Sequence, residues 1–146
     1  KAEMDGIGRV LYYARDIWPN FISCALVVHE DLIKSNPGVV QDLVRGIAES
    51  GEWAETHRAE AAKLVSPYYR QDEKVLNYVL TSDPARVSYV NLTPTNEDLQ
   101  MIQNMGFQMG LLTKQIPMDE IIDRNFVPET ITPAAIDATK IPDPKK

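Results

Sequence analysis

The stretch Ile22-Ser23-Cys24-Ala25-Leu26-Val27-Val28 decides the expected fold, because it is the longest apolar run in the chain. Its β-branched residues favour a strand. Since polar residues do not alternate along it, it is typical of a strand covered on both faces, as in a parallel sheet packed by helices. Arg9-Val10-Leu11-Tyr12-Tyr13-Ala14 is a second such stretch, and Trp18-Pro19-Asn20 breaks regular structure between the two. The sequence therefore predicts two strands near the N-terminus.

From residue 30 onward the pattern becomes helical. Asn36-Pro37 is a strong helix start, because proline has no amide to leave unpaired in the first turn. Apolar residues then recur every three or four positions to about Ala54, which predicts a long helix with one buried side. Thr95 begins a later helix, with Asp98 completing a capping box. Shorter helices are predicted over 57–65, ending at Ser66-Pro67, and over 71–80 and 116–122, with extended chain over 87–92 as a third strand.

Charge and cysteine content exclude several classes of protein. The 146 residues contain 15 Lys and Arg against 21 Asp and Glu, a net charge of −6 that repels phosphate backbones, so a nucleic-acid-binding face is not expected. No stretch reaches the roughly 18 apolar residues of a bilayer span. The single cysteine, Cys24, excludes an internal disulfide, and with His29 and His57 it does not form a zinc-binding pattern. We expect no metal site and no cofactor.

Catalytic constellations are also missing from the sequence. His29 precedes Glu30-Asp31, which could orient it as a general base, but a histidine in this setting is more often solvated or structurally bonded. No glycine-rich phosphate loop and no nucleophile beside a histidine were found. We therefore expect a binding protein and no enzyme.

The segment from Tyr12 to Asn20 is the best candidate for ligand contact. It combines aromatic planes, a charge pair and an amide in a partly irregular stretch, a mixture that binding clefts favour because aromatic walls exclude water while a few polar groups orient the ligand. The alternative is a crossing segment that covers the edge of the core. The predicted ligand-binding residues are Tyr13, Asp16, Trp18 and Asn20.

The order of several segments resembles a known family. These segments are Gly8-Arg9-Val10-Leu11, Asp16-Ile17-Trp18-Pro19-Asn20, the run from Cys24 to Val40, and the helix start Thr93-Pro94-Thr95. In this order and spacing they are similar to the later part of the periplasmic substrate-binding proteins of ABC importers. The most similar branch serves nitrate, alkanesulfonates and taurine, and thiamine-pyrimidine precursors.

The resemblance implies an α/β fold, the C-terminal portion of a type II periplasmic-binding-protein fold, mostly helical with two or three strands near the N-terminus and in the middle. Residues 1–20 would be an extended, hinge-proximal return segment, residues 21–127 a helical α/β lobe portion, and residues 128–146 an irregular proline-rich tail. The implied function is binding of a small oxyanion, sulfonate or pyrimidine-like solute in the periplasm, or outside the cytoplasm on a membrane anchor, for an ABC permease.

The resemblance also implies that the N-terminal half of such a protein is missing from this chain. The strand around Leu26 would then lack its normal neighbours, and an unpaired apolar strand is a template for pairing. Either the missing half or a second copy of the chain would complete it. The alternative is a free-standing helical domain for protein interaction or ligand sensing. An enzyme related to pyrimidine synthesis would need a lysine or histidine cluster that the sequence does not show.

Overall fold

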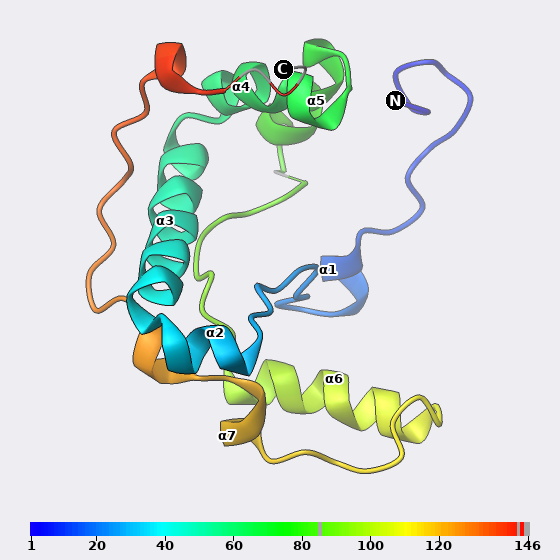
Figure 1. Ribbon diagram of the computed structural model, residues 1–146. Coiled ribbons are helices and arrows are strands. Elements are labelled where there is room, and N and C mark those ends of the chain that lie inside the picture. The colour runs from blue at the N-terminus through cyan, green and yellow to red at the C-terminus, as the bar shows by residue number, and fades with distance from the viewer. Residues whose placement is uncertain (85, 143, 145–146) are drawn as a thin grey trace. The chain divides into compact units, whose positions relative to one another are not determined.

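The structure is a computed structural model that describes residues 1–84, 86–142 and 144 (Figure 1). Within these ranges the chain is built from α-helices and short 3-10 helices joined by irregular segments, and no residue lies in a strand. The helices are α1 (Ala14–Ile17), α2 (Glu30–Ser35), α3 (Pro37–Thr56), α4 (Arg58–Tyr69), α5 (Glu73–Thr81), α6 (Asn96–Gln108), α7 (Met118–Ile121), η1 (Arg124–Phe126) and η2 (Ala138–Lys140).

The prediction of an α/β fold with two or three strands is therefore wrong. Residues 9–13, 21–28 and 87–92 are irregular, although their compositions favour strands. A strand is stabilised by hydrogen bonds to its neighbours and by packing of its faces, so strand propensity alone does not produce one. Among the described residues, no neighbouring strand pairs with these segments, so their local preference for a strand is not realised.

More of the helix predictions are confirmed, because a helix forms its backbone hydrogen bonds between residues that are close in sequence. Helix α3 begins at Pro37 as predicted, and Thr95 caps α6 by accepting a hydrogen bond from the Asp98 amide at 3.1 Å. Helix α5 begins two residues later and ends one residue later than the predicted range of 71–80. The predicted stop at Ser66-Pro67 is wrong. Helix α4 continues through Pro67 and ends after Tyr69, where Arg70 adopts a left-handed conformation with φ of 52°.

The chain divides into two compact units. Unit 1 comprises Lys1–Tyr13, Ala48–Val90 and Ile131–Lys146, and unit 2 comprises Ala14–Ile47 and Asn91–Thr130. Helix α3 contributes its first part to unit 2 and its last turns to unit 1. The predicted division at residues 1–20, 21–127 and 128–146 follows the order of the chain and stays a prediction.

Unit 1 is organised around the contact between α4 and α5, which Figure 1 shows near each other. Ala61, Ala62 and Leu80 are buried there, and Trp53, Ala54, Leu76 and Tyr89 pack against them. Among the described residues, the C-terminal segment contacts the rest of this unit through a hydrogen bond from the Ala134 amide to the Glu49 carbonyl at 3.1 Å and one from the Tyr68 hydroxyl to the Pro142 carbonyl. Two of the three core residues are alanines, so the buried apolar surface is small.

Unit 2 is held by polar contacts as much as by apolar ones. Val40 is its buried apolar residue, at 2% exposure, and Gln103 on α6 is buried at 4%. The Gln103 side-chain amide donates to the Ile116 carbonyl at 2.9 Å and accepts from the Ile116 amide at 2.5 Å. The Gln41 side chain on α3 donates to the Phe126 carbonyl at 3.2 Å. These contacts fasten the segment after α6 to the helices.

Candidate functional site

The candidate ligand segment in unit 2 begins with the single turn of α1. The Trp18 amide donates to the Ala14 carbonyl at 2.7 Å, which extends the turn by one residue. Asn20 follows with φ of 58°, a left-handed conformation that asparagine tolerates better than most residues, and it reverses the chain. The Trp18 and Phe21 rings meet edge to face, with centroids 5.6 Å apart and planes at 64°. This reversal places two aromatic rings together.

The indole nitrogen of Trp18 is the distinctive polar atom of this segment. Among the described residues, Trp18 Nε1 is the side-chain nitrogen or oxygen that is buried yet has no hydrogen-bond acceptor. Leaving a buried donor unpaired costs about 1–3 kcal/mol, so an acceptor brought by another molecule would be bound favourably. The indole N–H donates and never accepts, which selects carbonyl, carboxylate, nitrate or sulfonate oxygens as partners.

The structure brings three of the four predicted ligand residues into one unit. Asp16, Trp18 and Asn20 lie within five positions of one another in unit 2, and the Asp16 carboxylate is 4.0 Å from the Arg15 guanidinium. Tyr13 belongs to unit 1, where the Arg86 guanidinium lies 5.5 Å from the centre of its ring. Their contact with a ligand stays a prediction.

A polar cluster around Arg86 in unit 1 was missed by the sequence analysis. The Arg86 guanidinium donates to Glu3 at 2.5 Å, to the Tyr78 hydroxyl at 2.7 Å and to the Ser82 hydroxyl at 3.2 Å, and it lies 4.5 Å from the centre of the Tyr78 ring. The hydrogen bond from Arg86 holds the pKa of the Glu3 carboxyl below its usual value. Glu3 and Arg86 are distant in sequence, so no local pattern could reveal the pair.

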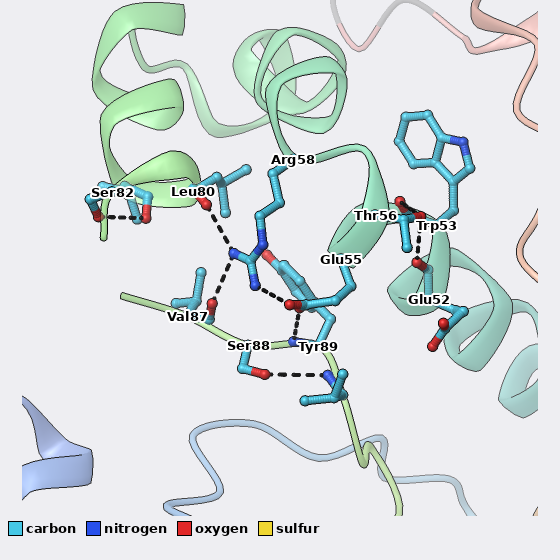
Figure 2. A network of polar contacts seen from close by, with 12 residues as sticks. Glu52, Trp53, Glu55, Thr56, Arg58, Leu80, Ser82, Val87, Ser88 and Tyr89 are labelled. Atoms are coloured by element: carbon cyan, nitrogen blue, oxygen red, sulfur yellow. Dashed lines mark hydrogen bonds and ion pairs between the residues drawn. The ribbon is translucent and has the colours of Figure 1, made fainter. Parts of the chain in front are cut away.

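A second network, drawn in Figure 2, is centred on Arg58 at the start of α4. Its guanidinium donates to the Leu80 carbonyl at 2.9 Å and the Val87 carbonyl at 3.0 Å, and it pairs with the Glu55 carboxylate. The other Glu55 oxygen accepts from the Tyr89 amide at 2.8 Å. The hydrogen bond from Arg58 lowers the pKa of Glu55. The network fixes the end of α5 and the segment after it to the junction of α3 and α4.

Both arginines are engaged by groups of the protein itself, so these networks are interpreted as structural. His29 also has a structural role, because its Nδ1 accepts from the Asp31 amide at 3.2 Å and caps α2. Across residues 1–84, 86–142 and 144, no three His, Cys, Asp or Glu side chains are grouped so that they could hold a metal ion. No helix in the same ranges is both long and apolar enough to cross a bilayer.

A surface hollow in unit 1 is lined by none of the predicted ligand residues. This hollow of about 460 Å³ lies between the N-terminal residues and the start of α5, and is lined by Lys1, Met4, Asp5, Arg70, Gln71, Asp72, Lys74 and Val75. Two of its charged groups are engaged with neighbours, since Asp5 pairs with Lys1 and Asp72 caps α5. Six of the eight lining residues are polar or charged and none is aromatic, whereas ligand pockets are typically lined by apolar and aromatic side chains.

Comparison with known protein families gives a match for the first part of the chain. Residues 1–66 match the sequence model of the NMT1-like family, a family of periplasmic binding proteins. No curated protein and no solved structure matches the chain. The matched region includes all four predicted ligand residues and helices α1 to α3. At this coarse level, the first 66 residues are similar to solute-binding proteins of the NMT1-like family.

Proposed function

We propose that this chain belongs to the solute-binding component of an ABC importer. The ligand would be a small oxyanion, a sulfonate or a pyrimidine-like molecule, bound outside the cytoplasm and passed to a permease. The similarity of residues 1–66 to the NMT1-like family supports a solute-binding role in transport. The ligand class and the permease partner go beyond this similarity and belong to the proposal.

The observation that carries the ligand proposal is the unpaired indole donor of Trp18. It lies inside the matched region, in contact with the Phe21 ring, and beside the chain reversal at Asn20. An apolar ring edge with one directed donor is suited to a small ligand that presents an oxygen acceptor. Nitrate and sulfonate oxygens and the carbonyl groups of pyrimidines share this chemistry.

The proposed mechanism is capture without a chemical step. The Trp18 indole donor is already shielded from water, so a bound solute would supply the acceptor that it lacks in a low-dielectric setting, and the bound state favours one conformation of the protein. We further propose that the chain is a portion of such a protein that lacks the N-terminal half. Support comes from residues 21–28, which have strand composition but no strand partner among the described residues.

The proposal can be tested through the two tryptophans, because each indole N–H gives one signal in a two-dimensional ¹⁵N–¹H NMR spectrum. Trp18→Phe removes and thereby assigns one of the two signals. The other, from Trp53 in unit 1, is an internal control, since Trp53 stacks on His57 at 4.9 Å and lies outside the candidate segment. The labelled chain is titrated with nitrate, taurine, methanesulfonate and pyrimidines, with chloride as the ionic-strength control.

A saturable shift of the Trp18 signal with at least one ligand, but not with chloride, is the expected result. Because the chain is proposed to hold only part of a cleft, the affinity is expected to be weak, with a dissociation constant of about 1 mM or above. Equal movement of both indole signals, or no saturable movement of Trp18 with any ligand of the panel, would contradict the proposal. A micromolar dissociation constant would contradict the proposal that this chain lacks the N-terminal half of the binding protein.

A further inference from the structure

Residues 21–28 form an exposed, apolar and unpaired segment of unit 2. Val27 is 89% exposed, Leu26 47% and Phe21 45%, while Ile22 and Val28 are partly buried. Among the described residues, none makes a backbone hydrogen bond to any amide or carbonyl of this segment. The segment thus offers both the backbone groups and the side chains that a neighbouring strand requires.

We propose that residues 21–28 pair with the same residues of a second copy of the chain, forming an antiparallel two-stranded ribbon across a two-fold axis at Cys24. The segment would be irregular in the single chain and become a strand on pairing. This proposal does not depend on ligand binding, and it can hold or fail independently of the solute-binding function.

Charge favours the antiparallel direction over the parallel one. Glu30 and Asp31 follow the segment after His29, at the start of α2, and both side chains are highly exposed. A parallel in-register pair would place each of these carboxylates beside its own copy, which is unfavourable. An antiparallel pair places the acidic groups of the two copies at opposite ends of the ribbon.

Symmetry and side-chain matching favour the register. In a symmetric antiparallel pair, opposite residues face the same side of the sheet, so the two-fold axis passes between one residue and its own copy. An axis at Cys24 places Phe21 opposite Val27 and Ile22 opposite Leu26, which are apolar pairs of the kind that stabilise sheets. An axis at Ala25 would instead place Ser23 opposite the highly exposed Val27.

The exposed apolar surface of unit 2 suits a weak dimer. Fifteen of its large apolar side chains are at least 38% exposed. At roughly 60–120 Å² of apolar surface for each full side chain, they present on the order of 700 Å², and a stable interface buries about 800 Å² per partner. Because a ribbon would cover only part of this surface, we expect a dissociation constant of about 10 μM or above. The exposed residues in question are Ile17, Phe21, Leu26, Val27, Val39, Leu43, Ile47, Leu92, Met101, Ile102, Met105, Phe107, Met109, Leu111 and Ile121.

The first test measures mass against concentration by size-exclusion chromatography with light scattering, in a reducing buffer. The wild-type chain is expected to shift from monomer toward dimer as its concentration rises. Val27→Lys places a charge opposite Phe21 of the other copy and is expected to weaken dimerisation at least about tenfold. Val39→Lys makes the same change on an exposed residue of α3 and should weaken it less than about twofold.

The second test uses oxidation by diamide to read the register, followed by non-reducing gel electrophoresis. An axis at Cys24 brings the two Cys24 Cα atoms to about 4.5–5.5 Å, within the range of a disulfide. A shift of the axis by one residue makes the two cysteines diagonal neighbours at about 7–8 Å, which is too far. Fast crosslinking is therefore expected for wild type, and slow crosslinking for Cys24→Ser/Ala25→Cys. Cys24→Ser/Ala59→Cys, with its cysteine at an exposed position of α4, measures random collision.

Three results would overturn the proposal. A wild-type chain that stays monomeric at about 500 μM would exclude useful self-pairing. If Val27→Lys and Val39→Lys weaken dimerisation equally, the interface does not lie at residues 21–28. Faster crosslinking at position 25 than at Cys24, or a wild-type rate equal to that of the Ala59→Cys control, would exclude the proposed register.

Discussion

Replacing Arg58 by methionine is expected to destabilise unit 1 strongly. Methionine keeps much of the apolar stem, while the change removes the donors to the Leu80 and Val87 carbonyls. Only 17% of the Arg58 side chain is exposed and 24% of the Glu55 side chain, so solvent screens the pair weakly. Two hydrogen bonds from a charged donor contribute roughly 1.5 kcal/mol each at the low end of their range, which predicts a loss of about 3 kcal/mol.

Urea unfolding followed by circular dichroism measures this loss. With a slope of about 2 kcal/mol per molar urea, the unfolding midpoint should fall by roughly 1.5 M. Arg45→Met is the matched control, because Arg45 also pairs with an acid three residues away on a helix, Asp42, but its side chain is 52% exposed. An exposed pair of this kind contributes less than about 1 kcal/mol. If Arg58→Met and Arg45→Met unfold at the same urea concentration, the structural role assigned to the Arg58 network is wrong.

Three further predictions test single contacts. The hydrogen bond from Arg58 lowers the folded-state pKa of Glu55, so its contribution to stability is present above the unfolded pKa of about 4.3 and is lost as the pH falls toward the folded value. Glu55→Gln should therefore flatten the fall in stability between about pH 5 and 3, as measured by urea unfolding at each pH, and a slope equal to that of wild type would contradict the pairing. Thr95→Ala removes the cap of α6 and should cost about 1 kcal/mol in the same assay, and a loss below about 0.3 kcal/mol would contradict the capping role. Gln103→Leu leaves both backbone groups of Ile116 unpaired and should cost about 2–3 kcal/mol, although it adds apolar volume; a stabilised variant would refute the contact.

Sequence alone predicted the structural features whose causes are local. Pro37 at the start of α3 and the Thr95–Asp98 capping box at the start of α6 each act within one helical turn, so the residues that produce them are adjacent in the sequence. The burial of Gln103 could not be predicted in the same way. Its partner is the backbone of Ile116, which is beyond the end of the helix, so no pattern within α6 could reveal the contact.

The candidate site was predicted in part for the same reason. Asp16, Trp18 and Asn20 are neighbours in sequence, so a local pattern could group them, and the structure keeps them in unit 2. Tyr13 was grouped with them by proximity along the chain, but the boundary between the units follows it directly. The unpaired state of the Trp18 indole depends on packing that no sequence pattern encodes.

The failure of the predicted strand bears on what the chain requires for folding. The composition of residues 21–28 is the strongest strand signal in the sequence, yet this segment remains irregular and exposed. Pairing energy comes from two chains or segments together, so a sequence can encode a preference for a strand without containing the partner that realises it. Helices α3 and α6 also present apolar surface without a partner that covers it, since both expose apolar side chains such as Leu43 and Met105 in unit 2. A solute-binding protein with the rest of its sheet, or a second copy in a ribbon, would satisfy the strand preference, and the Cys24 crosslink distinguishes the second from the first.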